Sequence, residues 1–188
     1  MHILIAGAGI AGLTAAVALR RHGIEATVLE QAHEIREIGA GVQIASNGAL
    51  VLRQLGLEEA VRKAGVIPGS YDYRDLTTGQ MLYAAPLGEE AAMRYGAPLY
   101  NLHRADLVQI LIDALPPDAL HLDAKCTAVV QDATGVEVRL QSGKVFCGDA
   151  LIGADGIHSF VREHLRGPEE KVFANILMWR ALHRGVAG

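Results

Sequence analysis

The stretch "HILIAGAGIAGLTAAVALRRHGIEATVLEQ", residues 2–31, decides the fold class of this 188-residue chain. It opens with a continuous apolar run at residues 2–6, which is typical of a short buried strand. Three glycines follow, and the next residues have helical spacing up to a stop at Gly23. A second apolar run, residues 25–30, closes on a glutamate. This order predicts a β-α-β unit with parallel strands.

The glycines satisfy the pattern G-x-G-x-x-G at Gly7, Gly9 and Gly12, between the predicted strand and helix. The first glycine allows a tight turn, the second lets the backbone approach a pyrophosphate, and the third lets helix and strand pack closely. Glu30, at the end of the second strand, can accept hydrogen bonds from ribose hydroxyls and would repel a 2′-phosphate. The pattern therefore predicts a dinucleotide other than NADP. It does not separate NAD from FAD, and a turn that serves only helix packing is the alternative.

Composition narrows the class of protein. The chain is 51% hydrophobic and 20% charged with a net charge of −4, which indicates a globular fold without the basic field that nucleic acid requires. We expect no integral membrane segment, because the first apolar run is too short and too rich in glycine. Cys126 and Cys147 have no C-x-x-C spacing, which favours two thiols in a reducing cytoplasm. The histidines are scattered, so no metal site is expected.

The rest of the chain alternates between short helices and strands. Apolar spacing and glycine stops predict two helices in residues 46–65, and tyrosines and turn residues predict antiparallel strands within 70–100. A helix is expected at 103–115, before two prolines. Three alternating runs in residues 125–149 predict a β-meander, and "DALIGADG" is expected to be a buried strand that leads into a last helix at 158–167.

Three ordered blocks carry a resemblance to a known family. They are "EIREIGAGVQIASNGALVLRQLGL" (34–57), "NLHRADLVQIL" (101–111) and "LIGADGIHSFVRE" (151–163), the last with the motif D-G-x-x-S-x-x-R. With them the chain resembles the class A flavoprotein aromatic hydroxylases, the group that includes salicylate and hydroxybenzoate hydroxylases. The resemblance implies FAD as cofactor. It also implies an α/β fold: a Rossmann-like FAD-binding domain of the GR2 type, para-hydroxybenzoate hydroxylase-like, with a β-meander and the start of a substrate-domain sheet.

The same resemblance implies a domain organisation. Residues 1–70 and 101–170 are expected to form a discontinuous FAD-binding domain, and 71–100 and 171–188 parts of a truncated substrate-covering β lobe. "MWRAL", residues 178–182, is similar to the opening strand of that lobe. Members of the family are usually much longer and carry a second FAD motif with G-D after this point. We therefore expect the chain to be an N-terminal portion of such an enzyme.

By resemblance, ten residues are expected to bind the cofactor: Gly7, Gly9, Ala11, Gly12, Glu30, Gln31, Gln43, Arg104, Cys126 and Asp155. The family places Glu30 and Gln31 at the adenosine ribose and Gln43 near the ribityl chain or a ribose edge. Ala11 would contact the cofactor through its backbone. Cys126 would border the adenine through the strand backbone, and its thiol need not react there, since a small buried residue is the favoured interpretation.

Arg104 and the D-G loop complete the expected site. Arg104 begins a helix, where its guanidinium can bind phosphate oxygens, and a surface arginine is the alternative. Asp155 can cap the following helix, and Gly156 permits a positive φ. The resemblance places this loop beside the pyrophosphate and implicates it in handling NAD(P)H. Arg162 could hold Asp155 or contact the reductant.

The resemblance implies a flavoprotein monooxygenase. NADH or NADPH would reduce FAD, and a flavin C4a-hydroperoxide formed with molecular oxygen would hydroxylate a small aromatic or heteroaromatic substrate. No catalytic residue is assigned, because the family's candidates lie mostly beyond residue 188, and the chain alone could be inactive. The alternatives are an NAD-dependent dehydrogenase and a catalytically inactive FAD-binding module. Halogenases and reductases that share two of the blocks, and a homodimer, stay open.

Overall fold

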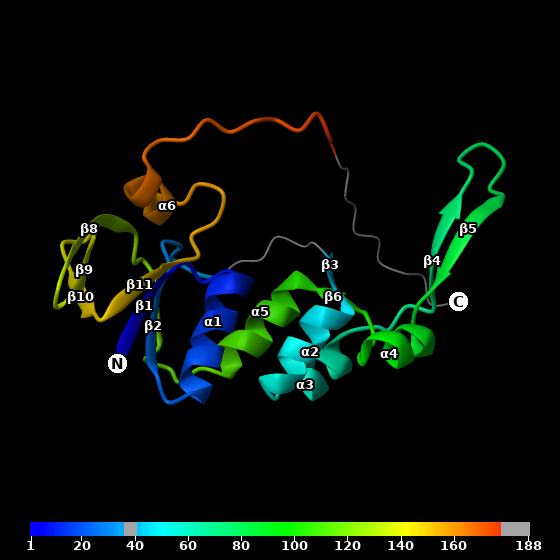
Figure 1. The fold of residues 1–188 in the computed structure, drawn as a ribbon, viewed down its shortest axis with the longest axis horizontal. Coiled ribbons are helices and arrows are strands. Elements are labelled where there is room, and N and C mark those ends of the chain that lie inside the picture. Colours follow the sequence, from blue (N-terminus) through cyan, green and yellow to red (C-terminus); the bar gives the residue numbers. More distant parts are fainter. Residues whose placement is uncertain (36–40, 178–188) are drawn as a thin grey trace. The chain divides into compact units, whose positions relative to one another are not determined.

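The computed structural model describes residues 1–35 and 41–177, which fall into two compact units (Figure 1). Unit 1 comprises Met1–Arg36 and Leu111–Gly188, and unit 2 comprises Glu37–Ile110. The predicted strand at 178–182 lies outside the described residues. The expected division into a cofactor domain and a substrate lobe concerns function and stays a prediction.

Unit 1 is built on a four-stranded parallel sheet with the order β11-β1-β2-β7. Its elements are β1 (His2–Ala6), α1 (Ile10–Arg21), β2 (Glu25–Leu29), β7 (Leu120–His121) and β11 (Ala150–Gly153). The predicted β-α-β unit with parallel strands is therefore confirmed. The expectation that this strand is buried is wrong. Among the described residues β11 pairs with β1 alone, and as an edge strand its residues are half-buried or exposed.

A β-meander covers one face of this sheet. It consists of β8 (Cys126–Asp132), β9 (Gly135–Leu140) and β10 (Val145–Gly148), which pair antiparallel as predicted. Leu4 and Leu29 share a buried cluster with meander residues such as Val138. Figure 1 shows α1 on the opposite side of the sheet from the meander. The predicted last helix is α6 (Phe160–Arg166), which contacts β11 and β8.

Unit 2 combines two antiparallel strand pairs with short helices. Its elements are β3 (Gly41–Ile44), α2 (Ser46–Gln54), α3 (Glu58–Ala64), β4 (Ser70–Arg74), β5 (Met81–Pro86), α4 (Glu89–Tyr95) and β6 (Tyr100–His103). β3 pairs with β6, and β4 with β5. α5 (Arg104–Asp113) crosses the boundary between the units and matches the helix predicted at 103–115.

Helix α4 was not predicted, although the sequence carries its signals. Glu89 and Glu90 lie in its first turn, and the left-handed Gly96 follows its last residue. The tyrosines around it favoured strands instead. Within the described part of the chain, no helix has the length and apolar character needed to cross a membrane.

Candidate cofactor site

A cavity of about 340 Å³ lies in unit 1, where the strands β1, β2 and β11 end. The carboxyl ends of parallel strands are where open α/β sheets bind ligands. Six of the ten predicted residues line it: Gly7, Gly9, Glu30, Gln31, Cys126 and Asp155. The structure thus brings together residues that are more than a hundred positions apart in the sequence.

Gly7 and Gly12 are required by the protein's own packing. Gly7 has a φ of +101°, and a Cβ there would lie 2.4 Å from the carbonyl oxygen of Ala154. A Cβ on Gly12 would lie 1.9 Å from the carbonyl oxygen of Gly7. The first glycine therefore makes the tight turn and the third brings helix and strand together, as the pattern predicted.

Gly9 differs from both of its neighbours in the motif. A Cβ there would meet no atom within 4 Å, and the residue lines the cavity. Its φ of −73° is accessible to any residue. No packing or backbone constraint within the described protein therefore demands glycine at this position, whereas a ligand that approaches the backbone closely would demand it.

The N-terminus of α1 opens beside Gly9, which is its N-cap residue. No side chain caps this end, and its first turn contains no acidic residue. The first N–H groups of a helix have no partner within the helix, and they carry a partial positive charge. This end is therefore prepared for an anionic group such as a pyrophosphate. Ala11 is exposed in the first turn and does not line the cavity.

Glu30 is held rigidly at the cavity wall. Its Oε2 accepts a hydrogen bond from the N–H of Ala8 at 2.8 Å, and its Oε1 accepts one from the N–H of Ala32 at 2.8 Å. Its own N–H donates to the carbonyl of His121, and its carbonyl accepts from the N–H of Ala124. Each carboxylate oxygen has a second lone pair. The carboxylate can therefore still accept hydrogen bonds from ribose hydroxyls without moving.

Cys126 faces the cavity as a neutral thiol. Burial, and next the negative charge of Asp155, raise the pKa of this thiol to about 11. Because the thiolate is the reactive form, Cys126 is a poor nucleophile at neutral pH. The structure favours a small, half-buried lining residue over a reactive one.

The loop after β11 is organised by Asp155. Ser159 caps α6 by accepting a hydrogen bond from the N–H of Arg162, and its hydroxyl donates to Asp155. The other carboxylate oxygen of Asp155 accepts from the N–H of Val161 at 3.1 Å. The predicted capping role is therefore confirmed. Arg162 does not hold Asp155: its side chain donates to the carbonyl of Ile157 and pairs with Glu169 at 3.3 Å.

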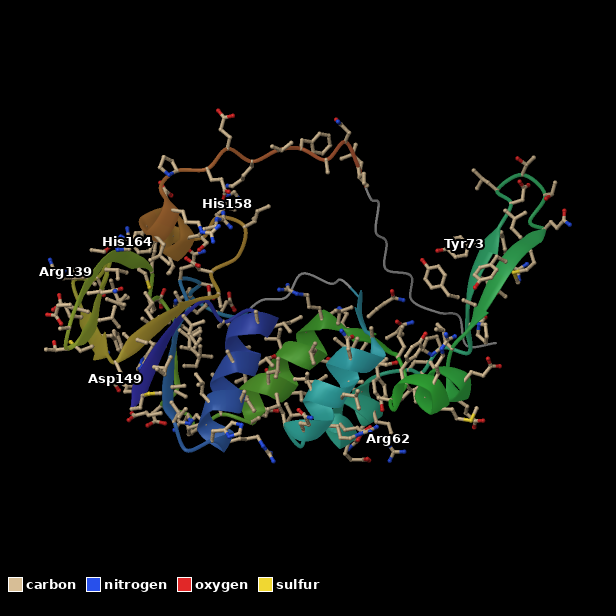
Figure 2. All side chains as sticks on the ribbon, in the orientation of Figure 1. Arg62, Tyr73, Arg139, Asp149, His158 and His164 are labelled. Carbon is tan, nitrogen blue, oxygen red and sulfur yellow. The ribbon has the colours of Figure 1, made fainter. Side chains whose placement is uncertain are left out.

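The lining residues that were not predicted to bind the cofactor include Lys125, His158 and Phe160. His158 and Phe160 occupy variable positions of the D-G-x-x-S-x-x-R motif, and the motif reports only its fixed positions. Figure 2 places His158 in the loop that precedes α6, and its ring contacts the ammonium of Lys171. For Lys125, the only sequence signal is that it directly precedes the predicted residue Cys126.

Gln43 and Arg104 belong to unit 2. Gln43 lies on β3 opposite Asn101 of β6, and Arg104 begins α5 directly after β6. Their role at a cofactor stays a prediction. Among the residues that the structure describes, no group of three or more His, Cys, Asp or Glu side chains could hold a metal ion.

The residues of this cavity fit the ADP half of a dinucleotide. The open space beside Gly9 and the uncapped helix suit a pyrophosphate, and the carboxylate of Glu30 suits a ribose. Comparison with known proteins decides the family, since residues 1–183 match the family described as "FAD binding domain". The chain belongs to this family.

The curated relatives of this FAD-binding chain are aromatic monooxygenases. It is 41% identical to 3-amino-4-hydroxybenzoate 2-monooxygenase PtmB3 of Streptomyces platensis over 184 residues, which cover 98% of this chain and 45% of that protein. It is 34% identical to 6-hydroxynicotinate 3-monooxygenase of Pseudomonas fluorescens, over 96% of this chain and 47% of that protein. The chain therefore spans just under half the length of these relatives.

Solved structures confirm the predicted fold. HpxO of Klebsiella pneumoniae, solved with FAD and uric acid, matches with a TM-score of 0.81 and 32% identity over 87% of this chain and 41% of that one. The 2,6-dihydroxypyridine-3-hydroxylase of Arthrobacter nicotinovorans matches with a TM-score of 0.73 and 27% identity over 89% and 40%. The predicted α/β fold of the para-hydroxybenzoate hydroxylase type and the resemblance to class A flavin hydroxylases are both confirmed.

Proposed function

We propose that this chain forms the FAD-binding part of a flavin-dependent aromatic monooxygenase. The observation that carries the proposal is the open space beside Gly9, at an uncapped helix end and within the same cavity as the carboxylate of Glu30. FAD supplies the redox and oxygen chemistry of such enzymes when it is bound. The residues of this chain bind and orient the cofactor.

The ten predicted residues would divide this task. Gly7 and Gly12 shape the turn, Gly9 and Ala11 offer backbone to the pyrophosphate, and Glu30 receives the adenosine ribose. Gln31, Cys126 and Asp155 would form further parts of the cavity wall, and Gln43 and Arg104 would contact the cofactor, as the resemblance implies. In support, six of these residues line one cavity.

The relatives suggest the substrate class. Their names specify an amino-hydroxybenzoate and a hydroxynicotinate, both of which are hydroxylated aromatic acids. We infer that the complete protein hydroxylates a ring of this kind with molecular oxygen, and that NADH or NADPH is the reductant. A cytoplasmic location remains our prediction from the cysteine usage, and a homodimer stays open.

Titration of the purified chain with FAD tests the proposal. We expect binding that a Glu30→Gln variant weakens by about tenfold or more, because a neutral amide presents one acceptor to the two N–H donors of Ala8 and Ala32. Glu25→Gln is the matched control, since Glu25 begins the same strand and is exposed. Intrinsic fluorescence or calorimetry gives the dissociation constants.

Two outcomes would overturn the proposal. A chain that binds NAD but not FAD would support a dehydrogenase, and equal FAD affinity in the Glu30→Gln and Glu25→Gln variants would remove the cavity as the site. NAD(P)H oxidation in the presence of FAD and hydroxybenzoates or hydroxynicotinates separates a monooxygenase from a binding module. FAD binding without turnover supports the module for this chain alone.

A further inference from the structure

Two adjacent loops form part of the cavity wall in unit 1. The first follows β2 and contributes Glu30 and Gln31. The second precedes and enters β8 and contributes Ala124, Lys125 and Cys126. The way these two loops are held together therefore shapes this part of the cavity wall.

Backbone hydrogen bonds join the loops beyond the ends of their strands. The N–H of Glu30 donates to the carbonyl of His121 at 2.9 Å, and the N–H of Ala124 donates to the carbonyl of Glu30 at 2.7 Å. Further out, the N–H of Asp123 donates to the carbonyl of Ala32 at 3.1 Å. These bonds continue the pairing of β2 with β7 and bring the two loops into contact.

A side-chain pair closes the outer end of this contact. Nδ1 of His33 lies 2.9 Å from Oδ2 of Asp123, so one loop is tied to the other by charge as well as by backbone. Asp123 has a φ of +52°, and it is one of only two non-glycine residues with positive φ in the described chain. Both side chains are largely exposed, 85% for His33 and 66% for Asp123. Core packing therefore does not explain why they meet.

We propose that His33 and Asp123 are positioning residues, a clamp that holds the outer ends of the two adjacent loops together and thereby supports the fit of the adenosine part of FAD. The inference rests on the proposed function, because it assigns this part of the cavity to the adenosine. Neither residue touches the cavity, so both act through the loops that they join. The carboxylate of Glu30 lies in the same loop, three residues before His33.

The clamp depends on pH. The hydrogen bond to Asp123, and then its charge, raise the pKa of His33 above its usual 6.5, and the charge of Glu34 acts in the same direction. The charged pair is thus complete below pH 6.5 and is lost as the pH rises through the raised pKa. FAD should bind more tightly in mildly acidic solution than in alkaline solution.

FAD dissociation constants at about pH 6 and about pH 8.5, on either side of the imidazole titration, test the clamp. We expect affinity to fall by about threefold across this range in the wild type, the size of effect that an exposed ion pair can supply. His33→Gln and Asp123→Asn should each remove this change, and the double variant should behave like either single variant. His22→Gln is the control for an exposed histidine outside the clamp, and it should leave the pH dependence intact.

His33→Lys separates positioning from general stability. Lysine stays charged across the whole range, so this variant should keep the tight binding at alkaline pH. An unchanged pH dependence in both His33→Gln and Asp123→Asn would overturn the clamp. So would a shift in melting temperature without any change in FAD affinity. A wild-type chain that binds no FAD at either pH would instead refute the proposed function.

Discussion

The cavity of unit 1 and the β4–β5 hairpin of unit 2 use their side chains in opposite ways. Around the cavity, polar groups are directed at specific partners, as Glu30 is at Ala8 and Ala32. On the hairpin, the ring of Tyr73 contacts those of Tyr71 and Tyr83, with centroids 5.1 and 6.1 Å away, and all three side chains remain about half exposed. Figure 2 shows Tyr73 on this hairpin.

The difference shows where a substitution should matter. All the described residues that line the cavity belong to unit 1. A substitution among them therefore changes contacts within that unit directly. Every residue of β4 is exposed. The aromatic side chains of the hairpin therefore gain little stabilisation from burial against other described residues. Effects on folding and FAD affinity should therefore be large at the glycine turn and small on the hairpin.

Gly12→Ala should have the largest effect. The new Cβ would lie 1.9 Å from the backbone oxygen of Gly7, so α1 must move away from the end of β1. We expect the free energy of unfolding to fall by about 3 kcal/mol or more, since backbone cannot yield as a flexible side chain would. Urea denaturation followed by circular dichroism measures it. Wild-type stability would show that the turn is looser than this packing implies.

Gly9→Ala should separate folding from binding within the same turn. Its Cβ would meet no protein atom within 4 Å, so stability should stay within about 0.5 kcal/mol of the wild type. FAD affinity should fall by about tenfold to a hundredfold, because the methyl group would occupy the space that a pyrophosphate needs. Paired denaturation and FAD titration measure the two effects. Full affinity in this variant would place the pyrophosphate elsewhere.

Local sequence signals predicted most of unit 1, and they did so for physical reasons. Gly7 and Gly12 predicted the turn correctly because a side chain at either position would clash with backbone. Continuous apolar runs predicted β1 and β2 because α1 and the meander cover the two faces of these strands. The site was harder. The pairing of His33 with Asp123 depends on two loops ninety residues apart, and neither residue type is distinctive in sequence.

In the region of the hairpin, the sequence signals were less reliable. Its strands were predicted from tyrosines and turn residues, but α4 was missed because the same tyrosines outweighed a short helix with acidic and glycine ends. β11 was taken as buried because an apolar run does not reveal whether a strand has one neighbour or two. Edge position is a property of the assembled sheet.

Tyr73→Ser should have the smallest effect. Tyr73 touches Tyr71 and Tyr83 on an exposed face, so its loss should destabilise the hairpin locally and leave the unfolding of unit 1 unchanged within about 0.5 kcal/mol. FAD affinity should stay within about twofold of the wild type, because the cavity lining contains no hairpin residue. FAD titrations of Tyr73→Ser and Gly9→Ala under the same conditions allow the two losses of affinity to be compared. A tenfold loss of FAD affinity in Tyr73→Ser would mean that FAD binding depends on the hairpin. The two regions would then differ in how exposed their side chains are, but they would not act independently in binding.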